Sequence, residues 1–210
     1  MTEQAQRQRV VKTVQGWLGF RESNGTHKKI IDIYNAHEPL AVGYKVKYTD
    51  AWCAATVSAA FIAAGLADIA PTECSCPRMI ELYKRQGRWM ENDGYVPKPG
   101  DIVMYDWQDS GVGDNCGTAD HVGIVESVTA AKMVIIEGNL DNAVGRRELP
   151  INGRYIRGFC LPKYATKRKV YTGDRKIVQE KTGYDDNTMA FLETHPFPDD
   201  LFRKAAKAMK

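Results

Sequence analysis

Cys53 is the residue in this sequence whose position most clearly suggests chemistry. It follows Asp50-Ala51-Trp52 and opens an alanine-rich segment, a composition that favours a helix. Thr49 or Asp50 is expected to cap this helix, which would place Cys53 in its first turn. Unpaired N–H groups and the helix dipole lower the pKa of a thiol there and so supply thiolate, the nucleophilic form. The same pattern also fits an unreactive cysteine packed in a core, so other residues must decide.

A cysteine nucleophile needs a nearby base, and the base needs a group that orients it. His121 is the best candidate among the four histidines, because it opens a predicted strand directly after a glycine-bearing loop. Such a position holds a side chain rigidly beside an accessible cleft. The other three lie in a polar helix start, at a helix end and in the C-terminal tail: His27, His37 and His195.

The orienting group is expected from the next predicted strand, residues 132–139. Glu137 and Asn139 are two residues apart and therefore point to the same face, and the glycine between them permits close backbone approach. If strands 121–128 and 132–139 pair as an antiparallel hairpin, His121 falls opposite the Glu137–Asn139 end. The alternative is that these two polar residues only terminate a strand.

The order of elements along the chain predicts an α+β fold, because helices come first and strands follow. Helical periodicity and helix end signals predict four helices, at 4–18, 26–36, 53–64 and 77–86. Strand-like runs separated by turns occur at 102–107, 121–128, 132–139, 146–149 and 155–161. Their short connections indicate an antiparallel sheet on which the N-terminal helices pack.

Three further short helices are predicted beyond this region, at 174–181, 187–193 and 198–209. We therefore expect a main domain at 1–164 and a small helical appendage at 165–210. The segment from residue 163 to the C-terminus contains 11 Lys/Arg and 7 Asp/Glu, whereas the rest of the chain is nearly neutral. This balance suits contact with an anionic surface, although the helices could simply cover the main domain. No basic recognition helix stands out, so no nucleic-acid partner is expected.

Composition fits a globular protein: 210 residues, of which 43% are hydrophobic and 26% charged. No apolar run approaches the ~20 residues needed to cross a bilayer, so no membrane insertion is expected. The polar N-terminus lacks the apolar segment of a signal peptide, which predicts synthesis in the cytoplasm. Five cysteines, an odd number, argue against a disulfide framework, and Cys74-Ser75-Cys76 has poor spacing for structural zinc.

Four segments, taken in order, resemble the CHAP family. They are DAWCAATV at 50–57, PGDIV at 99–103, DHVGIV at 120–125 and IEGN at 136–139. This family comprises cysteine, histidine-dependent amidohydrolases/peptidases with a papain-like α+β core, found in phage endolysins and bacterial cell-wall hydrolases. The resemblance spans about residues 10–163 and depends on the ordered combination, since each piece alone is weak.

The resemblance implies that Cys53 is the nucleophile, that His121 is the base, and that Glu137, with Asn139, holds the imidazole. The implied substrate is bacterial cell-wall peptidoglycan, cut in its peptide stem or at the muramoyl–alanine amide. The positive charge of the tail separately suits binding to anionic wall polymers. A phage or prophage enzyme of this kind would reach the wall through a lysis system. Amidase and endopeptidase remain undistinguished. Two alternatives stay open: a non-catalytic wall-binding module of the same fold, and an intracellular cysteine amidase that acts on a small amide.

No cofactor and no metal are expected. Some family members bind calcium just before the nucleophile, but here Lys45 and Lys47 stand where calcium would need oxygen ligands. The loop at 109–115 has oxygen ligands without EF-hand spacing and is expected to line the substrate site. Candidate substrate-binding residues near the nucleophile and base are Trp52, Tyr105, Trp107 and Asp120, although aromatic residues on strands are more often core. Asp120 is also a weaker orienting candidate, because it points away from the face of His121.

Overall fold

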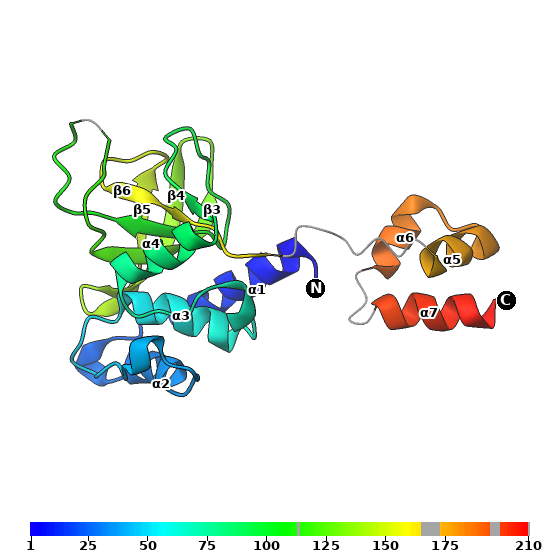
Figure 1. Cartoon of the computed structure of the whole chain (residues 1–210), viewed down its shortest axis with the longest axis horizontal. Helices are drawn as coiled ribbons and strands as arrows, with labels where there is room; N and C mark the ends of the chain where they lie inside the picture. The colour runs from blue at the N-terminus through cyan, green and yellow to red at the C-terminus, as the bar shows by residue number, and fades with distance from the viewer. Residues whose placement is uncertain (113, 165–172, 194–197, 210) are drawn as a thin grey trace. The chain divides into compact units, whose positions relative to one another are not determined.

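The computed structural model describes residues 1–112, 114–164, 173–193 and 198–209. Its contacts divide the chain into two compact units, Arg7–Tyr164 and Met1–Gln6 with Ala165–Lys210. The architecture combines N-terminal helices, one antiparallel sheet and short C-terminal helices (Figure 1), which confirms the predicted α+β class. Within the described residues, no helix is both long and apolar enough to cross a membrane.

The helices of the first half lie where the sequence pattern predicts them, with shifted ends. They are α1 (Glu3–Gln15), α2 (Lys28–Asn35), α3 (Cys53–Ala63) and α4 (Cys76–Arg85), with short 3-10 turns at Glu22–Asn24, Ala41–Gly43 and Ala67–Ile69. The helix predicted at 4–18 ends earlier, at Gln15, because Gly16 follows and the chain turns. Every residue of α3 from Cys53 to Phe61 is buried, which its small side chains permit.

The sheet has six antiparallel strands in the order β1-β6-β2-β3-β4-β5. Their bounds are β1 (Trp89–Met90), β2 (Ile102–Tyr105), β3 (His121–Val128), β4 (Lys132–Leu140), β5 (Ala143–Pro150) and β6 (Ile156–Cys160). The prediction missed β1, which has only two residues and exists through its pairing with the end of β6. The strand predicted to reach residue 107 stops at Tyr105, where a turn begins.

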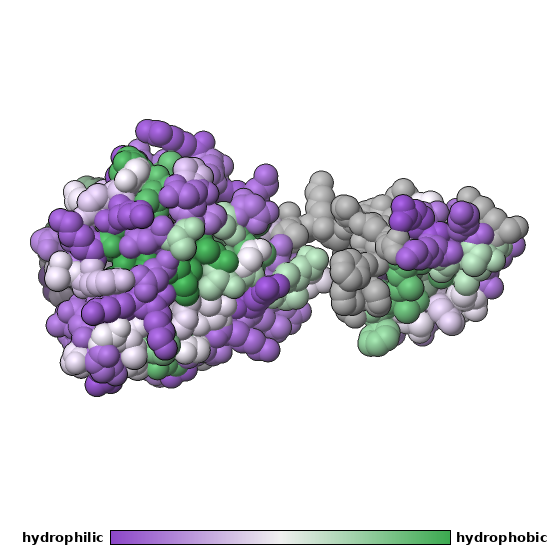
Figure 2. Space-filling view, turned by 90° about the horizontal axis from the view of Figure 1, so that it is seen from below, coloured by the Kyte–Doolittle hydropathy of each residue, from purple (hydrophilic) through white to green (hydrophobic). Residues whose placement is uncertain are grey.

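The two faces of the sheet belong to different hydrophobic clusters, as the alternation of strand side chains requires. One face, which includes Met104, Val122 and Ile136, packs in the same cluster as α3. The other face carries Val103, Tyr105 and a second group of buried residues: Val125, Met133, Ile135 and Phe159. Hydrophilic residues cover much of the visible outer surface, with hydrophobic residues between them (Figure 2).

The β3–β4 hairpin has the register that the sequence analysis expects. Gly123 pairs with Glu137 and Ile124 with Ile136, so His121 at the start of β3 lies toward the end of β4. On the α3 side of the sheet, a Cβ on Gly138 would lie only 2.0 Å from Thr56 Oγ1. The first turn of α3 therefore rests directly on the backbone of β4, and only glycine fits at this position.

The C-terminal helices form a small core of their own. They are α5 (Asp174–Thr182), α6 (Asp186–Leu192) and α7 (Pro198–Ala208). Asp185 caps α6, because its carboxylate accepts the Thr188 N–H at 2.7 Å. The apolar centre consists of Val178, Met189, Phe202 and Ala206. Residues 165–172 and 194–197, which include His195, lie outside the described residues.

Gly138→Ala is expected to lower the free energy of unfolding by about 2 kcal/mol, because the new methyl group would force Thr56 and the start of α3 away from β4. Denaturant unfolding would measure this change. Gly94→Ala is the matched control, since a Cβ there meets only the tip of the exposed Asn92 side chain. Equal stability of the two variants would show that α3 does not depend on this close approach.

Candidate active site

Cys53 is the first residue of α3, with Trp52 as its N-cap. The predicted side-chain cap is wrong: Trp52 supplies no such bond, and Asp50 accepts the Lys47 N–H at 2.8 Å and the Tyr44 hydroxyl at 2.7 Å instead. The Asp50 carboxylate therefore stabilises the turn before the helix. Because no side chain caps α3, its first-turn N–H groups remain directed toward the nucleophile end.

The start of α3 is held in place by Thr56. Its hydroxyl donates to the Trp52 carbonyl at 2.8 Å, which tightens the first turn. The same side chain contacts β4 at Gly138, the residue after Glu137. The thiol at the start of the helix is thereby brought to the end of the sheet that carries the predicted base.

His121 and Glu137 form a hydrogen-bonded pair on one face of the sheet. The distance from His121 Nε2 to Glu137 Oε2 is 3.1 Å, and the side-chain exposures are 12% and 0%. Gly123 lies opposite Glu137, where a Cβ would come within 2.8 Å of Glu137 Cγ. The missing side chain of Gly123 leaves the space through which Glu137 reaches the histidine.

Arg147 on β5 is a site residue that the sequence analysis missed. Its Nε donates to both carboxylate oxygens of Glu137, at 2.8 and 3.1 Å. Its guanidinium carbon also lies 4.8 Å from the centre of the Trp107 ring. Burial would raise the pKa of Glu137, but hydrogen bonds from His121 and Arg147 outweigh it and keep that pKa below its usual value. A buried acidic residue needs such a partner, and that need is the sequence signal that could have prompted a search for one.

The thiol of Cys53 and the ring of His121 act on each other electrostatically, because each shifts the pKa of the other. Because Nε2 faces Glu137, Nδ1 is the ring nitrogen left for the sulfur. The order sulfur, imidazole, carboxylate is that of a nucleophile, its base and the group that orients the base.

The electrostatics favour a thiolate beside an imidazolium. The pKa of Cys53 falls well below its ordinary value, chiefly because the Cys76 thiol donates to it; burial opposes this, and His121 and the Ala54 N–H add to it. Burial lowers the pKa of His121, yet the Cys53 sulfur and the Glu137 carboxylate raise it to about 9. Each partner therefore stabilises the charged form of the other.

Asn139, unlike Glu137, does not hydrogen-bond the His121 ring. It has a left-handed φ of 59° at the irregularity of β4, and its side chain is half-buried. Among the described residues, the side chain that bonds the His121 ring is that of Glu137 and not that of Asn139. The backbone departs from the pleat between these two residues, so the strand alternation that predicted a shared face does not extend to Asn139.

The structure separates the four candidate substrate-binding residues. Trp52 is fully buried and donates to Glu22 Oε1 at 2.9 Å, so it belongs to the core. Tyr105 is also fully buried, and its ring stacks on His121 with 5.7 Å between centroids. Trp52 and Tyr105 are therefore not exposed for substrate binding as predicted. In both cases, burial of a large aromatic ring against the core is more favourable than its exposure to solvent.

Trp107 and Asp120 remain accessible beside the base. The half-buried Trp107 ring lies 6.1 Å from His121 between centroids, and its backbone N–H donates to the exposed Asp120 carboxylate at 3.2 Å. These two can therefore contact a substrate next to His121, whereas Tyr105 supports the imidazole from below the surface.

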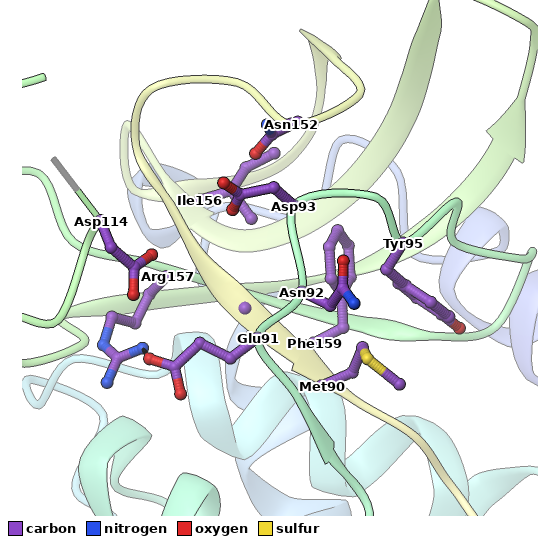
Figure 3. Close-up of a pocket in the computed structure, with 11 residues that line it drawn as sticks. Met90, Glu91, Asn92, Asp93, Tyr95, Asp114, Asn152, Ile156, Arg157 and Phe159 are labelled. Atoms are coloured by element: carbon purple, nitrogen blue, oxygen red, sulfur yellow. Dashed lines mark hydrogen bonds and ion pairs between the residues drawn. The ribbon is translucent and has the colours of Figure 1, made fainter.

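A separate hollow lies beside β1 and β6 (Figure 3). Neither Cys53 nor His121 lines this hollow. The Arg157 guanidinium in its wall pairs with the carboxylate of Glu91, the residue that follows β1. Ile156 in the same wall pairs with Tyr105, the strand neighbour of His121, so this wall lies toward the same end of the sheet. The acidic residues that line the hollow are Glu91, Asp93 and Asp114.

The comparison with protein families agrees with this geometry. Residues 43–139 match the model of the CHAP domain, a range that contains Cys53, His121, Glu137 and Asn139. No curated protein and no solved structure matches the chain. CHAP domains are generally cysteine- and histidine-dependent amidohydrolases or peptidases that act on peptidoglycan. Residues 43–139 of this chain are therefore similar to a CHAP domain, the family that the sequence motifs resemble.

Proposed function

We propose that this protein is an endolysin-like peptidoglycan hydrolase that cuts an amide bond by attack of the Cys53 thiolate. The bond would lie in the peptide stem or at the muramoyl–alanine link. The observation that carries the proposal is the hydrogen-bonded series His121, Glu137 and Arg147, whose histidine also lowers the pKa of the Cys53 thiol. A non-catalytic wall-binding module would have no need of a buried carboxylate held against a histidine and a thiol.

The reaction would begin with the thiolate–imidazolium pair already formed. Cys53 attacks the amide carbonyl carbon, and negative charge develops on the carbonyl oxygen. The N–H groups in the first turn of α3 stabilise this oxyanion, because they have no intrahelical partner. Asn139, half-buried at the end of β4, is the alternative donor to that oxyanion.

His121 then acts as the general acid. Its Nδ1 proton passes to the leaving amine, and the bond between carbon and nitrogen breaks to leave a thioester on Cys53. The neutral ring next removes a proton from water, which attacks the thioester and releases the acid. Glu137 keeps the ring oriented throughout, and Arg147 keeps Glu137 in place.

The C-terminal helices would serve as an accessory to this reaction. Phe191 and Tyr184 expose 73% and 45% of their surfaces there, beside the net positive charge of the segment. Such a mixture suits a polyanionic wall polymer that also offers apolar patches. We propose a wall-targeting module at 165–210 and a hydrolase domain at 1–164.

Purified sacculi test the function directly. The wild-type protein should release soluble fragments, and mass spectrometry of their new ends should identify one kind of cut amide bond. Cys53→Ala should release them at least about 10³-fold more slowly, because the nucleophile is gone. Cys116→Ser is the matched control, since Cys116 is an exposed thiol in a loop and should leave the rate unchanged. Equal rates for Cys53→Ala and wild type would refute the thiol mechanism.

The pH profile tests the role of Glu137. The wild-type rate should fall above about pH 9, where His121 loses the proton that the leaving amine requires. Glu137→Gln removes a negative charge that stabilises the imidazolium, so the pKa of His121 falls and the alkaline limb moves to lower pH. An unmoved alkaline limb in this variant would contradict the pairing.

Arg147→Gln should reduce kcat about tenfold with little change in KM, because Glu137 loses the partner that positions it. Arg146→Gln is the matched control one residue earlier. Arg146 pairs with Glu126 at 2.6 Å, and this partly exposed pair includes none of the catalytic residues. Steady-state kinetics on soluble wall fragments would distinguish the two; similar kcat values would remove Arg147 from the site.

A further inference from the structure

A second thiol lies against the proposed nucleophile. Cys76 Sγ is 3.8 Å from Cys53 Sγ, and both residues are 6% exposed. Cys53 begins α3 and Cys76 begins α4, so the two sulfurs meet where two helices start. Both helix starts favour negative charge at this point.

The segment before α4 is tied to α3 by a buried clamp. Ser58 on α3 donates to the Glu73 carbonyl at 2.6 Å and accepts the Glu73 N–H at 2.9 Å. The Glu73 carboxylate in turn accepts the Cys74 N–H at 2.8 Å and the Arg78 Nε–H at 2.9 Å. These bonds fix the start of α4 beside the start of α3, so the contact between sulfurs is a built feature of the fold.

The two thiols differ in protonation. Cys53 is the thiolate of the pair, as described above, whereas its negative charge and burial raise the pKa of Cys76 well above the ordinary value. The neutral Cys76 thiol therefore donates to the Cys53 sulfur. Such an arrangement places a reactive sulfur next to a protonated thiol that can react with it after oxidation.

We propose that Cys76 is a resolving thiol, which converts hydroperoxide damage at Cys53 into a reversible Cys53–Cys76 disulfide. Formation of the disulfide does not depend on the proposed function. Its effect does rest on that function, because hydrolysis would stop while the disulfide is present. A disulfide needs a sulfur–sulfur distance near 2.05 Å, so the sulfurs must approach by roughly 1.8 Å, within reach of side-chain rotation.

The chemistry balances with one hydroperoxide. The Cys53 thiolate attacks a peroxide oxygen, the O–O bond breaks, and hydroxide leaves and takes up a proton to become water, or an alcohol where the peroxide is organic. The product is a sulfenic acid on Cys53. The Cys76 sulfur then attacks the Cys53 sulfur, the S–O bond breaks, and the hydroxyl leaves as water with the Cys76 proton. Two thiols are oxidised and one peroxide is reduced.

The neighbouring cysteines are less suited to this step. The Cys74 N–H donates to the Glu73 carboxylate, and burial is the largest cause of the raised pKa of the Cys74 thiol. Burial alone raises the pKa of Cys160, which keeps that thiol protonated and unreactive. Without a resolving thiol, the sulfenic acid would be exposed to a second peroxide and pass irreversibly to the sulfinic acid.

The test treats the full-length protein with hydrogen peroxide at about equimolar amounts and then maps peptides by mass spectrometry without reduction. We expect a linked Cys53–Cys76 peptide pair, and a loss of hydrolysis on sacculi that a dithiol reductant restores nearly completely. Cys74→Ser should behave like wild type and is the matched control. In Cys76→Ser, peroxide should convert Cys53 to the sulfinic acid. After dithiol treatment this variant should therefore recover about tenfold less of its initial activity than the wild type does.

The mapping requires no variant to fold and no wall activity, so it remains decisive if the proposed function fails. Absence of the Cys53–Cys76 pair in oxidised wild type overturns the inference, as does a pair between Cys53 and Cys74. Equal recovery of Cys76→Ser and wild type also overturns it. A linked pair in a protein that does not digest sacculi would refute the proposed function and leave the resolving thiol established.

Discussion

The close approach of α3 to β4 is the constraint on which the rest of the site depends. Gly138 has no side chain, so the first turn of α3 can rest on the strand backbone through Thr56. This contact brings a helix start, with its unpaired N–H groups, to the strand end that holds His121 and Glu137. A single Cβ at this position would clash with Thr56, so the first turn of α3 would have to shift on the densely packed sheet.

A buried carboxylate organises the other side of the site. Glu137 is 0% exposed, and an isolated charge there would be strongly unfavourable. His121 and Arg147 satisfy it from two neighbouring strands, and Gly123 leaves space for its side chain. The same hydrogen bonds that stabilise the burial also orient the imidazole, so folding and preparation for catalysis use the same interactions.

Local patterns predicted much of this arrangement. The β3–β4 hairpin follows from two apolar runs with a short turn, and its register places His121 toward Glu137 as expected. Long-range partners were not predictable in this way. Arg147 and Cys76 reach the site from separate elements, and no periodicity indicates that either side chain points there. The predicted side-chain cap of α3 was wrong for a related reason, since the Asp50 carboxylate accepts the Lys47 N–H in the turn before the helix instead.

The sequence by itself determined the chemical groups, the α+β order of elements and the pairing of the central hairpin, because propensity and alternation act over a few residues. Only the tertiary structure decided that Glu137 rather than Asn139 bonds the histidine. It also decided that Trp52 and Tyr105 are core rather than surface, and that a second thiol adjoins Cys53. Each of these outcomes depends on burial and on hydrogen bonds between distant segments, which the packing of the whole domain sets and no local pattern encodes.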